Sequence, residues 1–187
     1  MIPDLILPPH VAWASVAFAN GSVIHKATRV GDLNGVFSDV LAYQKRDPLD
    51  VVYHVEMLDS PADAGALYVG VTHLNAGKIG DEFFMTRGHF HKQREQGEVY
   101  FGLCGEGLLL LQSEQGNARL ERVAPGSVHI IPPFTAHRLI NTGPATLSSL
   151  AVWPSVAGHD YAALAEGFAL RVFSSAHHSE GWEARHE

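Results

Sequence analysis

Between about residues 50 and 155, short β-type segments alternate with turn residues, and this pattern constrains the fold more than any other feature. Gly, Pro and Asn separate the segments at intervals typical of an all-β sandwich or barrel. The predicted strands cover residues 51–57, 66–74, 98–103, 107–112, 118–123, 128–131 and 145–152.

Helical segments are few in this sequence. Residues 160–166 have helical propensity and are closed by Gly167, and residues 36–46 are a second candidate for a short helix. The tail from Ser174 onward is polar, and we expect it to be frayed. We predict a single domain over residues 1–187, with N-terminal strands that form a dimer arm (1–50), a barrel core (51–155), and a short helix, a strand and a polar tail (156–187).

The composition argues against several classes of function. With 46% hydrophobic and 18% charged residues among 187, the chain is globular and long enough for one buried core. The net charge is −7 and no cluster of Lys and Arg is present, so we expect no nucleic-acid partner. No signal-peptide pattern or membrane span is apparent, and we expect a cytoplasmic protein without a membrane partner. Cys104, the only cysteine, is expected to be a buried structural thiol.

The chemically informative stretch contains His89 and His91, followed after six residues by Glu98. Residues i and i+2 of a strand face the same way, so the two histidines can present their imidazoles together. The six intervening residues end in Gly97 and can reverse the chain, which would place Glu98 on an adjacent strand. A His-x-His pair is weak evidence by itself, because a chain with twelve histidines produces roughly 0.8 such pairs by chance.

A second block strengthens this reading. Pro132 and Pro133 are followed by His137 and then by Asn141. A turn at the two prolines can bring a returning strand beside the first pair, so that His137 becomes a fourth donor. Three imidazoles and one carboxylate suit a single divalent metal ion, with iron, zinc, nickel and cobalt favoured by imidazole and iron or manganese by the carboxylate.

In their order and spacing, the two blocks resemble the two metal-binding motifs of the cupin superfamily. The pattern Thr-x-Gly-His-Phe-His, six residues, then Glu-Val-Tyr is similar to that of the cupin-type glucose-6-phosphate isomerases. Ile131-Pro-Pro-Phe, Asn141-Thr-Gly143 and residues 157–161 add to the likeness, which covers about residues 50–162. The resemblance implies an all-β, cupin-type double-stranded β-helix (a jelly-roll-like barrel) with extra N-terminal strands and one or two short helices. It also implies a homodimer.

The resemblance implies a metal-dependent enzyme that interconverts glucose 6-phosphate and fructose 6-phosphate, through an enediol or by a metal-assisted hydride shift. It implies one divalent metal ion per chain, for which we predict Fe(II), with Mn, Zn, Ni or Co as alternatives. The implied metal ligands are His89, His91, Glu98 and His137. The implied catalytic residues are Glu98, His137, His159 and Tyr161. The implied substrate-binding residues are Tyr53, Thr72, Thr86, Arg87, Gly88, Tyr100 and Trp153.

Strict strand alternation would place Arg87 on the face of His89 and Thr86 on the opposite face. A kink at Gly88 would resolve this conflict, since strand glycines often mark bulges or close approach to a ligand. Arg87 is therefore either a phosphate partner or a solvent-facing residue. It stands where the resembled family often has Lys, and Trp153 stands where Tyr is expected, which replaces a hydroxyl by an indole N–H.

Two other functions are compatible with the same barrel. A non-haem iron dioxygenase could use three histidines and one glutamate with open coordination positions for dioxygen. A non-catalytic, metal-containing sugar-binding module is the second alternative, because a fold alone does not determine a function. The strand histidines His54, His73 and His129 are interpreted as surface residues or as core residues with satisfied hydrogen bonds.

Overall fold

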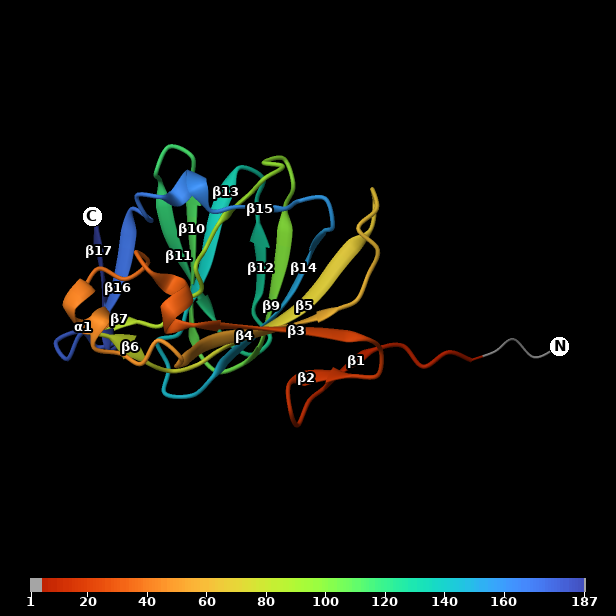
Figure 1. Cartoon of the computed structure of the whole chain (residues 1–187), viewed down its shortest axis with the longest axis horizontal. Helices are drawn as coiled ribbons and strands as arrows, with labels where there is room; N and C mark the ends of the chain where they lie inside the picture. Colours follow the sequence, from red (N-terminus) through yellow and green to blue (C-terminus); the bar gives the residue numbers. More distant parts are fainter. Residues whose placement is uncertain (1–4, 187) are drawn as a thin grey trace.

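A six-stranded antiparallel sheet is the largest unit of the computed structural model, which describes residues 5–186 (Figure 1). Its centre is β14, which pairs with β5 on one side and with β9 on the other. In spatial order the strands are β12 (Val128–Ile131), β9 (Glu98–Cys104), β14 (Leu147–Pro154), β5 (Leu67–Leu74), β4 (Val51–Leu58) and β3 (Val23–Arg29).

Smaller sheets complete the architecture. A three-stranded sheet has the order β11 (Ala118–Val123), β10 (Gly107–Ser113) and β13 (Thr135–Ile140). A four-stranded sheet has the order β17 (Trp182–His186), β16 (Leu170–Ser174), β7 (Glu82–Phe83) and β6 (Lys78–Ile79). The two-stranded pairs are β15 (His159–Asp160) with β8 (Phe90–His91), and β1 (His10–Ala12) with β2 (Ala17–Ala19), which lie beside β3 near the N-terminal end (Figure 1).

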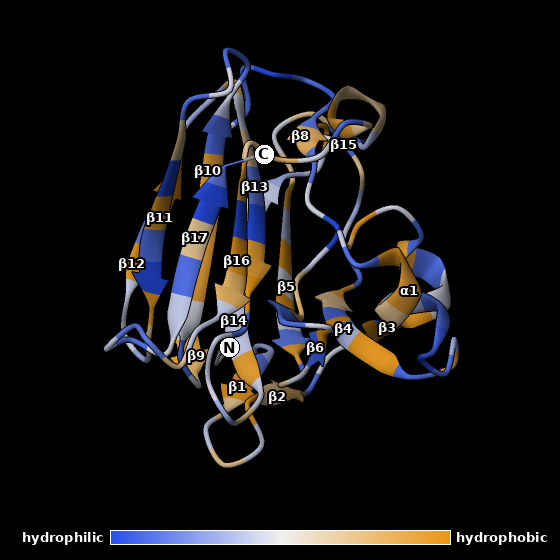
Figure 2. Ribbon diagram, turned by 90° about the vertical axis from the view of Figure 1, so that its left-hand side faces the viewer, coloured by the Kyte–Doolittle hydropathy of each residue, from blue (hydrophilic) through white to orange (hydrophobic). Residues whose placement is uncertain are grey.

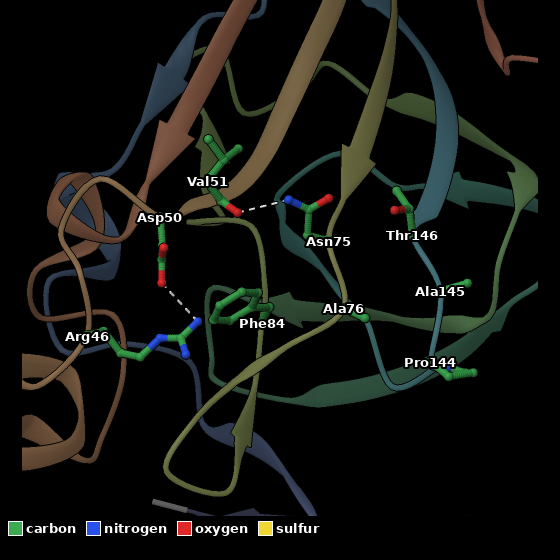
Figure 3. A pocket seen from close by; sticks show the side chains of 9 residues that line it. All are labelled: Arg46, Asp50, Val51, Asn75, Ala76, Phe84, Pro144, Ala145 and Thr146. Atoms are coloured by element: carbon green, nitrogen blue, oxygen red, sulfur yellow. Dashed lines mark hydrogen bonds and ion pairs between the residues drawn. The ribbon is translucent and has the colours of Figure 1, made fainter.

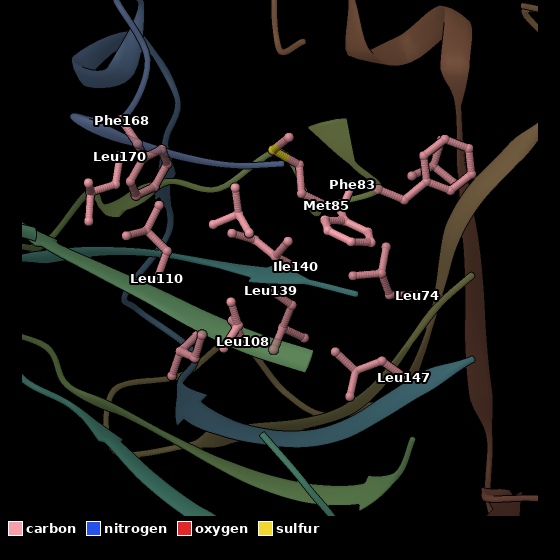
Figure 4. Packing of buried hydrophobic residues seen from close by; sticks show 14 of the residues in the cluster. Leu74, Phe83, Met85, Leu108, Leu110, Leu139, Ile140, Leu147, Phe168 and Leu170 are labelled. Atoms are coloured by element: carbon pink, nitrogen blue, oxygen red, sulfur yellow. The ribbon is translucent and has the colours of Figure 1, made fainter. Parts of the chain in front are cut away.

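The hydrophobic core is built around β10, whose run of four leucines is buried on both faces. Leu109 and Leu110 are fully buried, and Leu139 and Ile140 of the paired strand β13 join the same cluster (Figure 4). A continuous apolar run is the pattern expected of a strand that is covered on both sides. Each such side chain contributes about 1.5–3 kcal/mol to stability on burial, which fixes the frame that holds the site.

The predicted all-β fold with extra N-terminal strands is confirmed, and so are the strands on which it depends. The strands predicted at 51–57, 66–74 and 98–103 match β4, β5 and β9 to within one residue at each end. The helix predicted within residues 36–46 is α1 (Val40–Gln44), where the Asp39 side chain accepts a hydrogen bond from the Ala42 amide and caps the first turn.

Three expectations about the periphery were wrong. Residues 160–166 form a single 3-10 turn, η2 (Ala162–Leu164), because the preceding β15 pairs with β8 and tertiary pairing overrides helical propensity. The tail is not frayed throughout, since β17 pairs with β16 over five residues. The largely hydrophilic β17 lies beside the more hydrophobic β16 (Figure 2). Cys104 is exposed, because it ends β9 at an irregularity in the pairing with β14.

The N-terminal region adds a short 3-10 helix, η1 (Val30–Leu33), directly after β3. Residues 1–4 of the predicted N-terminal arm and residue 187 of the predicted polar tail lie outside the described residues. Within residues 5–186, no helix combines the length and apolar character needed to cross a membrane.

Candidate active site

A cavity of about 320 Å³ lies inside the barrel, and its wall is formed by β3, β4, β5, β9, β13 and β14 together with the segment that precedes β8 and the segment around β15. Among the predicted site residues, His91 does not line the cavity and instead contacts Glu98. The predicted residues that do line it are Tyr53, Thr72, Thr86, Arg87, Gly88, His89, Glu98, Tyr100, His137, Trp153, His159 and Tyr161.

Backbone pairing brings the three candidate imidazole ligands together. His89 forms an isolated β-bridge with His137 of β13, in which the His89 amide donates to the His137 carbonyl (3.3 Å) and the His137 amide to the His89 carbonyl (3.1 Å). His91 follows on β8. The ring centroids of His89 and His137 are 4.5 Å apart. The ring centroid of His91 lies 5.7 Å from that of His89 and 5.4 Å from that of His137.

Glu98, the first residue of β9, completes the cluster. Its Oε2 lies 3.1 Å from His91 Nε2 and 3.0 Å from His137 Nε2. The other ring nitrogen of His91, Nδ1, donates to the Gln96 carbonyl at 2.8 Å, which points Nε2 of that ring toward Glu98. One potential ligand atom from each of His89, His91, Glu98 and His137 lies within 4.8 Å of all the others.

The four residues fit a divalent cation. His89 Nε2 and both ring nitrogens of His137 are buried without a hydrogen-bond partner, although His137 Nε2 is in ionic contact with Glu98. Buried polar atoms are normally paired, and an unpaired one destabilises the fold. A cation within the cluster would satisfy His89 Nε2 and one ring nitrogen of His137, and three imidazoles with one carboxylate suit iron and related divalent metals.

The electrostatics of the cluster favour the protonation states that a metal requires at Glu98 and His89, but not at His91. Burial opposes ionisation of Glu98, but the neighbouring His137 and His91 outweigh burial and lower the pKa of this carboxyl. Burial, reinforced by the nearby His137, lowers the pKa of His89 well below 6.5, so this imidazole is neutral. For His91, burial opposes ionisation, but hydrogen bonds to Glu98 and Gln96 outweigh burial and raise the pKa, so a metal would compete with a proton there.

Gly88 interrupts the alternation of the strand before His89. Its φ of +74° lies in the left-handed region, and a Cβ atom would approach Phe168 Cε2 to 2.6 Å and Arg138 Nε to 3.0 Å. Because the chain kinks here, Thr86, Arg87 and Gly88 all border the cavity. The kink predicted from the sequence is confirmed, and it removes the conflict between Thr86 and Arg87.

The segment around β15 forms one wall of the cavity. The pairing of His159 with His91 places the His159 ring edge-on to His89, with centroids 4.2 Å apart. Tyr161 lies 5.9 Å from His159, and the Arg87 guanidinium lies 4.8 Å from the centre of the Tyr161 ring. Arg87 is exposed and also lines the cavity, so it stands at the mouth; its predicted role toward a phosphate stays a prediction.

Further aromatic residues line the cavity. The Tyr100 ring is 5.6 Å from that of His137. Burial, and then the charge of Glu98, raises the pKa of Tyr100 well above 10, so its phenol remains protonated and can donate a hydrogen bond. Trp153 packs edge-on against Tyr68 at 5.7 Å. Burial likewise raises the pKa of Tyr161.

Thr86 has a structural contact besides its place in the cavity wall. Its Oγ1 accepts a hydrogen bond from the Leu139 amide at 3.0 Å. The hydroxyl proton remains available, so Thr86 can act only as a donor toward a ligand phosphate.

Sequence reasoning missed the contribution of β3. Lys26 and Thr28 line the cavity together with Ile24, on alternate positions of one strand. The signal that could have identified them is the i, i+2 spacing of a cation and a hydroxyl within a strand that pairs with β4, which bears Tyr53. Lys26 supplies a positive charge that the net charge of −7 makes valuable for an anionic ligand.

His129 is a core histidine with satisfied hydrogen bonds, as the sequence suggested. Its Nδ1 lies 2.7 Å from Glu121 Oε2 and its Nε2 lies 2.9 Å from Ser127 Oγ. Both ring nitrogens are therefore occupied, and this histidine has no free ligand atom.

A second hollow lies between the start of β4 and the end of β5 (Figure 3). Its polar groups are engaged: Arg46 forms an ion pair with Asp50 at 3.1 Å, and the Asn75 side-chain amide donates to the Val51 carbonyl at 2.9 Å. It contains none of the predicted site residues and no histidine. The chemistry of the molecule is therefore assigned to the barrel cavity.

Comparison with known proteins agrees with this geometry. The family model "Glucose-6-phosphate isomerase (GPI)" matches residues 27–185. The chain is 44% identical over 149 residues to the glucose-6-phosphate isomerase of Thermococcus litoralis, and the aligned part covers 77% of each chain. It is 35% identical over 158 residues to that of Sinorhizobium medicae, covering 83% of this chain and 74% of the relative.

Likeness to solved structures is weaker. The oxalate decarboxylase of Lactobacillus farciminis aligns with a TM-score of 0.46 and 21% identity over 55% of this chain, which spans only 29% of that protein. Peruvianin-I from Thevetia peruviana aligns with a TM-score of 0.42 and 20% identity over 51% of this chain and 55% of its own. The family match and the sequence relatives therefore carry the assignment. The chain belongs to the glucose-6-phosphate isomerase family.

Proposed function

We propose that this protein interconverts glucose 6-phosphate and fructose 6-phosphate with the help of one divalent metal ion, Fe(II) in preference to Mn, Zn, Ni or Co. Family membership supplies the substrate pair. The observation that supports the metal dependence is the group of three imidazoles and Glu98 whose potential ligand atoms lie within 4.8 Å of one another, with His89 Nε2 buried and without a hydrogen-bond partner.

His89, His91, Glu98 and His137 would hold the metal. When bound, a divalent ion there polarises the sugar carbonyl and stabilises negative charge that develops on the substrate oxygens. The cavity places this cluster beside Tyr100, whose protonated phenol can donate to a sugar oxygen. Burial of the cluster keeps the local dielectric low, which strengthens each of these interactions.

Isomerisation moves one hydrogen between C2 and C1 of the sugar, and two routes remain for it. Glu98 can carry the proton between the two carbons, but a carboxylate with a lowered pKa, held by a cation, is a weak base. In the other route the hydrogen passes directly between the carbons, and Glu98 only positions the substrate. His159 and Tyr161 stand at the wall where they can hold the sugar hydroxyls in either route.

The substrate phosphate needs positive charge and hydrogen-bond donors. Lys26 and Arg87 supply the charge at the cavity wall, and the hydroxyl groups of Thr28, Thr72 and Thr86 line the same space. We place the phosphate between β3 and the Gly88 kink, and the sugar carbonyl toward Glu98. Tyr53 and Trp153 line the sugar between these ends.

The first test is to measure the interconversion before and after metal chelation, with Fe(II), Mn, Zn and Ni added back separately. Activity lost with chelator and restored by a metal is expected, and the order of restoration ranks the cofactors. Activity that survives complete chelation would remove the metal cluster from the mechanism. Dioxygen uptake with Fe(II) would indicate the dioxygenase alternative, and sugar-phosphate binding without turnover the non-catalytic module.

We also propose that the chain is a single domain that forms a homodimer through its N-terminal arm. Buried apolar residues from β10, β13, β16 and the segment before β8 join one core cluster, which supports a single domain.

Leu5, Ile6, Leu7 and Trp13 are 71–100% exposed, which is costly for an isolated chain in water. Sedimentation analysis tests this: a monomer of 20.3 kDa at micromolar concentration would contradict it. The lone cysteine agrees with a cytoplasmic location, which fractionation of the source cells would test.

A further inference from the structure

A second group of metal-binding side chains lies on the sheet face that turns away from the cavity. His54 and Glu56 occupy alternate positions of β4, and His73 of β5 stands directly opposite His54 in the register. Their neighbours Tyr53, Val55 and Thr72 line the cavity, so alternation directs this group to the other face. The potential ligand atoms of His54, Glu56 and His73 lie within 4.8 Å of one another.

His73 is the least satisfied member of this group. Only 6% of the residue is exposed, yet its Nε2 is buried without a hydrogen-bond partner. Its Nδ1 lies 2.9 Å from Ser148 Oγ. When Nδ1 donates its proton to that hydroxyl, Nε2 carries a lone pair directed at the group. A second hydrogen bond that orients the ring is typical of metal-ligating histidines. The interpretation of His73 as a satisfied core histidine is therefore wrong.

Glu56 provides the carboxylate. The residue is 8% exposed, and its Oε2 accepts a hydrogen bond from the Phe18 amide of β2 at 2.9 Å. Its Oε1 lies 4.0 Å from His73 Nε2 and 4.0 Å from His25 Nδ1 of the neighbouring strand β3. Both separations are too long for hydrogen bonds. A tetrahedral zinc ion with bonds of about 2.0–2.1 Å holds its ligand atoms about 3.4 Å apart, so a small side-chain adjustment closes the site.

The imidazoles of His54 and His73 are neighbours, and because nearly parallel rings direct their lone pairs in similar directions, one ring must rotate for both to bind one ion. The rings of His54 and His73 are stacked with centroids 4.5 Å apart and an interplanar angle of 19°. Two imidazoles and one carboxylate, with His25 as a fourth donor, form a nitrogen and oxygen set that suits Zn²⁺. His25 comes from β3, His54 and Glu56 from β4, and His73 from β5, so one ion would join three strands.

We propose that His54, Glu56 and His73, with His25 as the fourth ligand, form a second, structural Zn²⁺ site on the outer face of the sheet. Its ligand Glu56 also anchors β2 through the Phe18 amide, so the ion fixes the N-terminal hairpin against the barrel. This site does not depend on the proposed isomerase activity, because none of its residues lines the cavity.

The test is the stoichiometry of Zn²⁺ binding to the full-length, chelator-stripped protein, measured by calorimetry and by elemental analysis after dialysis. We expect two tight equivalents in the wild-type chain and one in Glu56→Gln, in which the Gln oxygen still accepts from the Phe18 amide. We expect one equivalent in His91→Asn, which disrupts the cavity cluster instead, and none in the double variant. His54→Asn, a milder change at a partly exposed position, serves as a second variant if Glu56→Gln does not fold.

A control pair separates this site from adventitious binding. His177 and His178 are exposed in the C-terminal region, and the double change His177→Asn/His178→Asn should leave two equivalents. A stabilisation test uses His91→Asn: Zn²⁺ at about 100 times Kd should raise its Tm by about 5–10 °C, and should not do so when Glu56→Gln is added. X-ray absorption of zinc-loaded His91→Asn should show only nitrogen and oxygen neighbours at about 2.0–2.1 Å.

Three results would overturn the proposal. The first is a single equivalent in the wild-type chain. The second is a second equivalent that survives both Glu56→Gln and His54→Asn. The third is a second equivalent that disappears in the His177→Asn/His178→Asn control. Failure of the proposed isomerase function would appear separately, as absent turnover in a wild-type protein that still binds two ions.

Discussion

Two histidine and carboxylate clusters lie on opposite sides of one sheet system, and they are built differently. The cavity cluster is placed by short and irregular elements: His91 lies on the two-residue strand β8, and His89 is held by a single β-bridge. The outer cluster sits on the long strands β3, β4 and β5 in regular register. Irregular backbone gathers the ligand atoms of the first cluster at the cavity, whereas strand alternation turns the outer cluster to the sheet face away from that cavity. The difference suits the first cluster to chemistry and the second to stability.

The largest effect should come from Glu98, and Glu56 provides the matched control. Glu98→Gln removes the charge at the centre of the cavity cluster, and we expect kcat/KM to fall by about 10²–10⁴-fold. Glu56→Gln makes the same chemical change on the outer face and should leave kcat/KM within about twofold of the wild type. Steady-state assays of both variants under identical metal loading decide this. Equal losses in the two variants would erase the functional distinction between the clusters.

Gly88→Ala tests the irregular backbone on which the cavity cluster depends. The new methyl group would lie 2.6 Å from Phe168, and the alanine backbone would have to adopt a left-handed φ. We therefore expect a loss of about 2–4 kcal/mol in the free energy of unfolding. Gly116→Ala is the matched control, since its φ is +81° but nothing lies within 4 Å. The control should lose only about 1 kcal/mol. Urea denaturation compares the two, and equal losses would show that the close contact with Phe168 is unimportant.

The pH dependence of stability should differ between His89→Asn and the wild type in metal-free protein. The pKa of His89 is lowered in the folded state, so the unfolded state binds more protons as pH falls below 6.5. His89 therefore makes stability decline toward acid, by up to about 1.4 kcal/mol per pH unit. His91, with a raised pKa, acts in the opposite direction in both proteins. Denaturation at pH 5.5 and 7.5 with chelator should give a smaller acid loss in His89→Asn.

The smallest expected effect concerns the outer cluster. Ser148→Ala removes the hydroxyl that orients His73, and we expect a loss of about 1 kcal/mol in the free energy of unfolding with unchanged kcat/KM. The loss should be larger in zinc-loaded protein than in stripped protein, because the ring orientation matters to a ligand. Thermal unfolding with and without Zn²⁺ measures the difference. An identical loss in both states would assign Ser148 to packing alone.

The strands and the cavity cluster were predictable because local patterns encode them. His89 and His91 are two residues apart, and Pro132 and Pro133 mark the return of the chain before His137. Non-local pairing explains what was missed. Nothing near Asp160 indicates that β15 pairs with β8 instead of starting a helix.

The outer cluster was overlooked for the same reason. His54 and His73 look like ordinary strand residues until the register of β4 and β5 places them opposite each other. Lys26 was missed because the face that it shares with Thr28 becomes meaningful only when β3 pairs with β4. Spacing within one strand is visible in a sequence, but the partner of that strand is not.

The pairing of β15 with β8 has a consequence for the order in which a nascent chain acquires its parts. Synthesis runs from the N-terminus, and the four candidate ligands are complete once His137 has emerged. His159 and Tyr161, which form the wall beside them, follow more than twenty residues later. A growing chain therefore contains all four candidate metal ligands before His159 and Tyr161 have been added. Metal binding can then precede completion of the cavity wall.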